Sequence, residues 1–217
     1  MKEHGGVYSA IVIDNVDPEH SGRLKVRLPQ TLVSGASGQE VWARLATLMA
    51  GANRGTWFIP DLKDEVLIAF EEGDLHRPYV LGALWNGANP PPAATNANNN
   101  IKLLRSRNGV TITLDDQDGG ENVVIETPGG QKLTLQDGPG AITLTDSNGN
   151  SMKLAPNGIT IDAAAKVTLN AGAVEVNAGI VSVNAAISKF SGVVQCDVLI
   201  SNSVVSQSYT PGAGNIW

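Results

Sequence analysis

Pairs of apolar residues, each pair separated by one intervening residue, recur along the second half of this 217-residue chain. The pairs are Ile112/Leu114, Val123/Ile125, Leu133/Leu135, Ile142/Leu144, Met152/Leu154, Ile159/Ile161, Val167/Leu169, Val174/Val176 and Val181/Val183. Their first members are 11, 10, 9, 10, 7, 8, 7 and 7 residues apart, which indicates a repeat architecture. Because side chains alternate between the two faces of a strand, each pair predicts a short strand with one apolar face.

The residues between the pairs divide the repeat into two parts. Turn-forming stretches such as D-D-Q-D-G-G-E-N and D-S-N-G-N separate the earlier pairs and predict hairpins. Shorter stretches such as N-A-G-A separate the later pairs and leave room only for a tight corner. The pair pattern fades after Val183, and the last 55 residues carry four charged side chains: Lys166, Glu175, Lys189 and Asp197.

Short strands with one apolar face and no helix have nothing of their own to cover that face. Burying some twenty aliphatic side chains favours folding by about 1.5 to 3 kcal/mol each, but ordering the backbone costs about 1 to 2 kcal/mol per residue. A single copy is therefore predicted not to fold, whereas three copies wound about one axis would bury every apolar stripe. We predict a homotrimer whose core includes Val167, Leu169, Val174, Val176, Val181 and Val183.

The first ninety residues differ in composition, since seven of the ten aromatic residues lie in the first 85 positions. Leu24, Val26 and Leu28 alternate with Arg23, Lys25 and Arg27, as in a strand with one buried face. Residues 45–55 could form one helical turn. Strands are predicted over residues 7–13, 22–28, 41–46, 56–60, 65–70 and 78–85, and this number of short strands favours a small barrel.

An uncharged stretch with six Asn and three Pro, residues 86–100, is typical of a linker. Around it we predict four segments: a barrel domain (1–92), an Asn-rich linker (93–100), a repetitive spike (101–200) and a C-terminal segment (201–217). The N-terminus lacks an apolar export signal and no run of about 18 apolar residues occurs, so a soluble chain is expected.

Three stretches resemble a known family in order and spacing: W-A-R-L-A, G-T-W-F-I-P-D-L-K-D-E-V-L-I-A-F-E-E-G-D and R-P-Y-V-L-G-A-L-W-N-G-A-N-P-P-P. From about Gly22 to Pro92 the chain is similar to the oligonucleotide/oligosaccharide-binding (OB) barrel of contractile-tail spikes, which include phage baseplate assembly protein V and the valine-glycine-repeat (VgrG) proteins of type VI secretion. The resemblance implies an all-β chain with an N-terminal OB-fold barrel and an intertwined trimeric β-helix spike. It also implies a membrane-piercing needle at the centre of a baseplate.

The same resemblance implies partners and a place of action. A baseplate hub protein would lie on the N-terminal side, and a proline-alanine-alanine-arginine (PAAR) tip protein at the C-terminal apex would contact Tyr209, Pro211, Ile216 and Trp217. Alternatively, this last segment folds back along its own trimer as an edge cover. Assembly in the cytoplasm into a phage tail or phage-tail-like particle, and action outside the cell during transient contact with a target membrane, are expected.

The sequence offers no catalytic, metal or cofactor constellation, so no enzyme activity is expected. Glu71, Glu72 and Asp74, with His76 nearby, fit a solvated turn better than general acid/base catalysis. The three His residues lie far apart, which disfavours a metal site. A net charge of -6 and aliphatic partners on the Arg23 strand disfavour nucleic-acid binding.

The tryptophans Trp42, Trp57 and Trp85 lie within apolar stretches and are predicted to be core or interface residues rather than ligand platforms. The main alternative function is a trimeric β-helix tail protein that binds or cleaves polysaccharide. That function would require a groove with paired carboxylates or exposed aromatic side chains.

Overall fold

The computed structural model describes residues 5–207 except 30–31, 33–37 and 139, and it divides the chain into two units, residues 1–166 and 167–217. Over these described residues the fold is all-β, with a single 3₁₀ turn, η1 (Glu71–Gly73), as its helical element. The first unit holds a barrel and a seven-stranded sheet. The predicted domain boundaries inside it, at residues 92 and 100, stay predictions.

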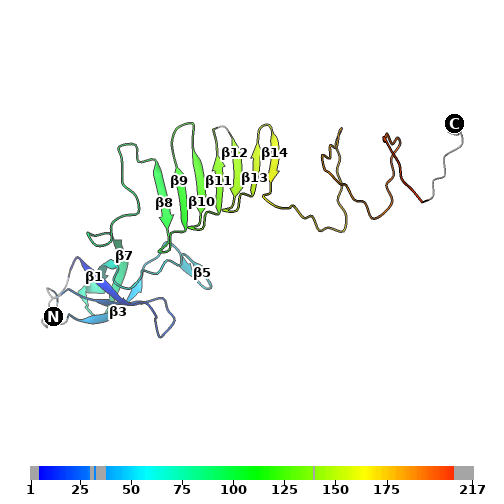
Figure 1. Ribbon diagram of the computed structural model, residues 1–217. Coiled ribbons are helices and arrows are strands. Elements are labelled where there is room, and N and C mark those ends of the chain that lie inside the picture. Colours follow the sequence, from blue (N-terminus) through cyan, green and yellow to red (C-terminus); the bar gives the residue numbers. More distant parts are fainter. Residues whose placement is uncertain (1–4, 30–31, 33–37, 139, 208–217) are drawn as a thin grey trace, which may run out of the picture. The chain divides into compact units, whose positions relative to one another are not determined.

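Five strands close the barrel in the order β1-β2-β3-β7-β6 (Figure 1). They are β1 (Val7–Asp14), β2 (Leu24–Arg27), β3 (Glu40–Leu45), β6 (Glu65–Phe70) and β7 (Pro78–Leu84). The pair β3–β7 is parallel and the other four pairs are antiparallel. This closed five-stranded arrangement fits the predicted OB fold.

The barrel interior is aliphatic, as the alternation on β2 predicted. Leu24 and Val26 are fully buried, whereas Arg23, Lys25 and Arg27 lie on the outer face. The remaining core residues come from every strand of the barrel and pack into one cluster: Ala10, Val12, Leu28, Ala43, Val66, Ile68, Phe70 and Val80.

Two local predictions for the barrel region were wrong. Residues 56–60 form no strand, and residues 45–55 form the short hairpin β4 (Ala50–Gly51) and β5 (Arg54–Gly55) instead of a helical turn. Gly55, at a φ of 148°, provides a backbone conformation that a side-chain-bearing residue rarely adopts. Asn53, two residues before Gly55, also has a positive φ, so the segment turns back on itself rather than continuing as a helix.

None of the three tryptophans belongs to the barrel core. Trp42 is half-buried on β3, where it stands opposite Lys25 with the Arg23 guanidinium 5.6 Å from its ring, and Trp57 and Trp85 are exposed. Their predicted alternative role as interface residues stays a prediction.

The Asn-rich stretch between β7 and β8 is irregular but organised by its own side chains. The Asn86 side-chain oxygen accepts hydrogen bonds from the backbone N–H groups of Ala88 and Asn89. Asn96 does the same for Asn98 and Asn99. These local turns explain how a stretch without strands keeps a defined path between two sheets.

Seven antiparallel strands follow as a meander in sequence order. They are β8 (Ile101–Arg105), β9 (Thr111–Asp115), β10 (Asn122–Glu126), β11 (Lys132–Gln136), β12 (Ala141–Thr145), β13 (Ser151–Ala155) and β14 (Gly158–Asp162). This confirms that the earlier apolar pairs form hairpins. The trimeric β-helix is a property of an assembly, and it stays a prediction for this chain.

Three of the hairpin turns have the same form and lie at the same end of the sheet. The four-residue turns S-R-N-G, T-P-G-G and D-S-N-G end in Gly109, Gly130 and Gly149, whose φ angles are 89°, 88° and 86°. A Cβ atom at Gly130 would lie 3.3 Å from Ser147 in the next turn of this series. The turns therefore stack closely, and each requires glycine at its fourth position.

Beyond β14 the described chain, residues 163–207, is extended and makes no strand pairs within one copy. Its backbone bends at Ala165, Gly172, Gly179 and Ala186, which are seven residues apart. The predicted tight corners therefore exist, and they have the spacing of the later apolar pairs.

Candidate functional site

The seven-stranded sheet carries two continuous ladders of apolar side chains on one face. The hydrogen-bonded register places each member of a sequence pair opposite a member of the next pair, as in Ile125 opposite Leu133 and Leu135 opposite Ile142. The first ladder contains Leu104, Ile112, Ile125, Leu133, Leu144, Met152 and Ile161. The second contains Leu114, Val123, Leu135, Ile142, Leu154 and Ile159. We call these two rows the apolar ladders.

The opposite face of the same sheet is mostly polar. The middle residues of the strands form a row across it: Leu103, Thr113, Val124, Thr134, Thr143, Lys153 and Thr160. The sheet is therefore amphipathic, and its apolar face is the one that needs a cover.

In a single copy the apolar ladders are not covered. Most of their members expose more than a third of their surface, and Leu144 and Ile161 expose more than half. Contiguous apolar surface of this kind marks a protein interaction face. The regular spacing of the ladders also constrains the partner, because only an equally regular apolar surface could cover one row along seven strands and the other along six.

One cation limits the second ladder. Lys102 on β8 stands opposite Leu114, where the ladder would otherwise begin. Its Nζ lies 3.3 Å from an Asp116 carboxylate oxygen, and it also donates to the Asn99 carbonyl oxygen. The second ladder therefore starts one strand later than the first.

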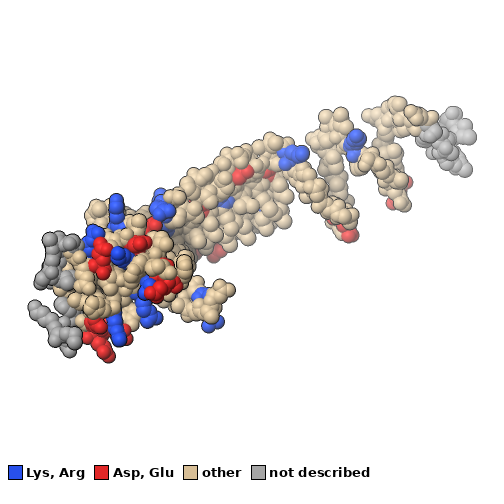
Figure 2. Space-filling model, turned by 90° about the horizontal axis from the view of Figure 1, so that it is seen from below, with Lys and Arg blue, Asp and Glu red and all other residues tan. Residues whose placement is uncertain are grey.

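The predicted trimer-core residues of the second unit, Val167 to Val183, are all exposed in one copy. The structure does not bring their side chains together within one chain. Figure 2 shows that charged side chains are sparse beyond the sheet, in agreement with the four charges in the last 55 residues. Their role as a trimer core stays a prediction, and the four predicted tip contacts, Tyr209, Pro211, Ile216 and Trp217, lie outside the described residues.

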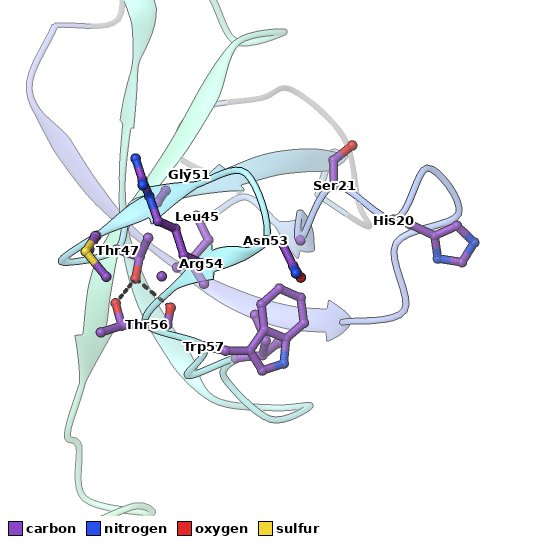
Figure 3. Close-up of a pocket in the computed structure, with 14 residues that line it drawn as sticks. His20, Ser21, Leu45, Thr47, Gly51, Asn53, Arg54, Thr56 and Trp57 are labelled. Carbon is purple, nitrogen blue, oxygen red and sulfur yellow. Dashed lines mark hydrogen bonds between the residues drawn. The ribbon is translucent and has the colours of Figure 1, made fainter.

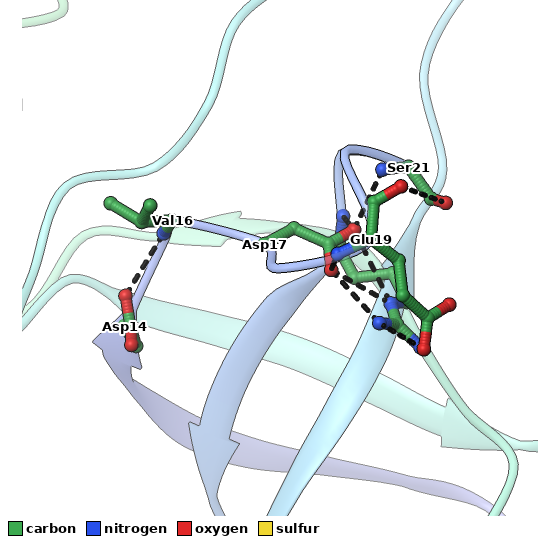
Figure 4. A network of polar contacts seen from close by, with 6 residues as sticks. Asp14, Val16, Asp17, Glu19 and Ser21 are labelled. Carbon is green, nitrogen blue, oxygen red and sulfur yellow. Dashed lines mark hydrogen bonds and ion pairs between the residues drawn. The ribbon is translucent and has the colours of Figure 1, made fainter.

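The β1–β2 loop of the barrel is held by one buried carboxylate (Figure 4). Asp17 accepts hydrogen bonds from the backbone N–H groups of Glu19, Ser21 and Arg23, at 3.0, 2.8 and 3.1 Å. The Arg23 guanidinium also donates to Asp17, with Nη2 2.9 Å from Oδ1, and this bond holds the pKa of Asp17 well below its usual range. Since all its partners belong to its own loop, Asp17 acts as a structural group.

The cationic stripe on β2 is neutralised by neighbouring carboxylates. Lys25 and Arg27 both pair with Glu40, at 3.0 and 3.3 Å, and these contacts lower the pKa of Glu40. Arg23 pairs with Asp17 and with Glu19. The stripe therefore has internal partners for its charge, which supports its interpretation as a solvated strand face.

A hollow of about 660 Å³ lies beside the β4–β5 hairpin (Figure 3). It is lined by His20, Ser21 and Asn53 and by the hairpin's Arg54, and the exposed ring of Trp57 forms part of its wall. The sequence analysis missed this hollow because it predicted a helical turn there. Its lining contains no Asp or Glu, so the pair of carboxylates that glycoside cleavage requires is not supplied here.

The acidic turn after β6 is solvent-exposed, as predicted. Glu71 accepts a hydrogen bond from the Tyr79 hydroxyl at 3.1 Å and lies 3.6 Å from Arg77. Asp74 accepts one from the His76 backbone N–H at 2.9 Å. These contacts fix the turn between β6 and β7 and leave no acid/base pair directed at a cavity.

Within the described part of the chain, no three His, Cys, Asp or Glu side chains gather where they could hold a metal ion. Within the same residues, no helix has the length and apolar character to cross a membrane.

A closed OB-type barrel followed by a repetitive β-region with an uncovered apolar face defines a class of self-assembling shaft proteins. Comparison with known families agrees with this class. Residues 8–85 match the type VI secretion system/phage-baseplate injector OB domain, and residues 122–182 match the phage baseplate V C-terminal trimerisation domain. The chain belongs to the VgrG-like baseplate spike proteins.

Several curated relatives carry this description. The chain is 26% identical over 144 residues to the type VI secretion system spike protein VgrG1b of Pseudomonas aeruginosa, covering 60% of this chain and 19% of the relative. It is 26% identical over 113 residues to spike protein VgrG3 of Vibrio cholerae, covering 49% and 11%. The actin cross-linking toxin VgrG1 of Vibrio cholerae is 27% identical over 113 residues, covering 49% and 10%. The chain thus spans about a tenth to a fifth of the length of these relatives.

The trimerisation match covers five of the seven strands in the sheet and the first corners beyond it. It supports the predicted homotrimer. Sequence reasoning missed Leu104 as a ladder member, because I-K-L-L-R has no unique alternation and only the pairing with Ile112 reveals which face Leu104 occupies.

Proposed function

We propose that this chain is the spike of a contractile injection machine and that three copies form its shaft. The uncovered apolar ladders are the observation that carries the proposal. Two apolar rows exposed to water do not stabilise a single copy, whereas three copies around one axis can bury the apolar ladders of every copy. The match to a trimerisation domain over residues 122–182 supports the same assembly.

The gain from covering the ladders is worked from their exposure. A fully buried aliphatic side chain contributes about 1.5 to 3 kcal/mol, and the ladder side chains have roughly half of their surface left to bury. Each therefore contributes about 1 kcal/mol on assembly, along six or seven positions in each row. That total is large enough to make folding of the sheet and trimer formation one event.

The finer parts of the proposal concern the ends of the shaft. We infer that the barrel faces a baseplate hub protein and that Tyr209 to Trp217 contact a PAAR-type tip protein. The shaft would act outside the producing cell, where it passes transiently through a target membrane. Support for these parts comes from the resemblance to phage baseplate and type VI spikes.

The proposed role is mechanical. The lining of the hollow contains no carboxylate, and in the acidic turn Asp74 accepts a backbone hydrogen bond and Glu71 pairs with Arg77. One curated relative, VgrG1 of Vibrio cholerae, is named an actin cross-linking toxin, but only about a tenth of its length is matched by this chain. No catalytic role is therefore transferred from that relative.

The homotrimer is tested with two charge substitutions on adjacent residues of β12. Ile142→Asp places a carboxylate on the apolar ladders, where three like charges would be buried without partners. Thr143→Asp places the same charge on the polar face, opposite Lys153. By size-exclusion chromatography with light scattering, wild type and Thr143→Asp should be trimeric and Ile142→Asp should not. A monomeric wild type at micromolar concentration contradicts the proposal.

The tip contact is tested by deleting residues 209–217 from the full chain. The truncated protein should remain trimeric and should lose a PAAR-type protein in a pull-down that wild type retains. Undiminished capture by the truncated trimer would assign these nine residues to another role, such as the edge cover.

A further inference from the structure

The bends in the second unit change their spacing along the chain. After Ala186 the backbone bends at Ser191–Gly192, Asp197, Asn202 and Gln207, so the interval falls from seven residues to five. Figure 1 shows this part, coloured orange to red, as an extended trace with sharp corners. The apolar pairs alone indicated that the repeat fades after Val183. The bends show instead that the repeat continues there with a shorter interval.

The amino-acid sequence has the same shorter period. Residues 193–207 divide at the bends into V-V-Q-C-D, V-L-I-S-N and S-V-V-S-Q, each ending in a polar residue. The second position is aliphatic in all three units, and the fourth is small: Cys196, Ser201 and Ser206. In the seven-residue units both of the corresponding positions are aliphatic, as in Val174 and Val176.

Exposure separates the two faces of these units even in one copy. Val194 and Val204, at second positions, are each 61% exposed, whereas their neighbours Val193 and Val205 are 95% and 98% exposed. In the middle unit the difference is smaller, with Leu199 73% exposed between Val198 at 77% and Ile200 at 93%. Second and fourth positions share a face because side chains alternate along extended backbone. That face combines one aliphatic and one small side chain per unit.

The shorter interval between bends shortens the straight stretch of chain between two corners. At about 3.3 Å per residue, seven extended residues span about 23 Å between corners and five span about 17 Å. A prism with shorter sides has less room at its axis. Replacement of an aliphatic side chain by Cys or Ser at the fourth position supplies the smaller volume that such a section requires.

We propose that residues 188–207 are a second, narrower section of the same trimer, and that their partner is the equivalent segment of two further copies. The face that they bury is defined by Val194, Cys196, Leu199, Ser201 and Val204. Five residues separate the segment from the end of the matched trimerisation domain at residue 182, and its three apolar pentapeptides contain one charge, Asp197, at a corner. This inference rests on the proposed homotrimer and assigns these twenty residues to its interface.

The single cysteine of the chain is a probe for this section. Cys196 is exposed in one copy and lies at a fourth position, so only an assembled section would protect it. In the trimeric full-length protein, a maleimide reagent should label Cys196 about 100-fold more slowly than in urea, the protection expected of a group that reacts only after local opening. A matched control is Gln195→Cys in a Cys196→Ser background, which places the thiol on the outer face and should label readily.

The outcomes distinguish this inference from the proposed trimer. Light scattering on each sample reports the oligomeric state independently of labelling. A trimer in which Cys196 reacts as fast as in urea overturns the narrow section and leaves the trimer intact. Equal protection at positions 195 and 196 overturns the two-sided face and points to a different cover, whereas a monomeric wild type overturns both proposals. Ile200→Cys in the same background is a second outward control if Gln195→Cys does not assemble.

Discussion

Replacing Ile68 by alanine tests whether the aliphatic interior holds the barrel together. Ile68 has no exposed surface and stands between Tyr8 and Val80 in the strand register. The substitution removes about three methylene-sized groups, worth about 0.8 kcal/mol each, and leaves a cavity among rigid neighbours. We expect a total loss of about 3 to 4 kcal/mol in the free energy of unfolding.

A matched control uses the same chemical change on the outer face of the barrel. Ile11 on β1 is 39% exposed, so Ile11→Ala should lose only about 1 kcal/mol because the site can collapse toward solvent. Urea unfolding followed by tryptophan fluorescence reports mainly on the barrel, since three of the four tryptophans, Trp42, Trp57 and Trp85, lie in the first 85 residues, and a Trp217→Phe background removes the signal of the fourth. With a urea dependence of about 1 kcal/mol per molar, the midpoints should fall by about 3 M and about 1 M respectively.

The urea midpoints of Ile68→Ala and Ile11→Ala could contradict the role of the aliphatic interior in two ways. Equal midpoint shifts for the two variants would mean that the closed aliphatic interior does not determine barrel stability. A shift below about 1 M for Ile68→Ala would mean that the interior relaxes around the missing groups, contrary to its dense packing.

Two further predictions concern the turns of the seven-stranded sheet. Hydrogen bonds from the Asn150 side chain and nearby backbone lower the pKa of Asp146 from 3.8 to about 2, and Asn150 in turn accepts a hydrogen bond from the Ala164 N–H. Because the folded pKa is the lower one, this contribution to stability is complete above about pH 4 and is lost as the pH falls toward about 2. The protection factor of the Ala164 N–H in hydrogen exchange, which corrects for the pH dependence of the intrinsic rate, should fall over that window, and Asp146→Asn should abolish this fall. Gly130→Ala, at a φ of 88°, should lower stability by about 1 to 2 kcal/mol, whereas Gly129→Ala should be nearly neutral; equal thermal shifts for the two variants would contradict the assigned backbone strain.

The barrel strands could be predicted from sequence because each carries its own signal. Leu24 and Val26 alternate with cations, and this pattern alone identifies β2 and its buried face. The β4–β5 hairpin lacks such a signal, since it contains two residues per strand and is set by positive φ angles at Asn53 and Gly55. Residue propensities for helix or strand do not predict a turn that requires positive φ angles at two nearby residues.

The candidate site was predictable in kind but not in detail. The pairs in the sequence predicted short strands with one apolar face, and the structure confirms those strands from β9 to β14. Their alignment into two continuous rows depends on the register between strands, which no single strand encodes. Apolar pairs do not reveal the change from seven-residue to five-residue bends, because the regular feature after Val183 is the polar or small residue at each corner.

The stacked turns at Gly109, Gly130 and Gly149 have a consequence for how such a chain changes its length. Successive turns are 21 and 19 residues apart, and each interval contains one complete hairpin. Removing or adding one interval moves the sheet by two strand spacings, about 10 Å, and returns every later side chain to its original face. A loss of a single strand would instead reverse the chain and bring the next turn to the wrong end. A sheet of this design can therefore be lengthened or shortened by whole hairpins. In evolution or in protein engineering, its length would change in steps of two strand spacings, about 10 Å.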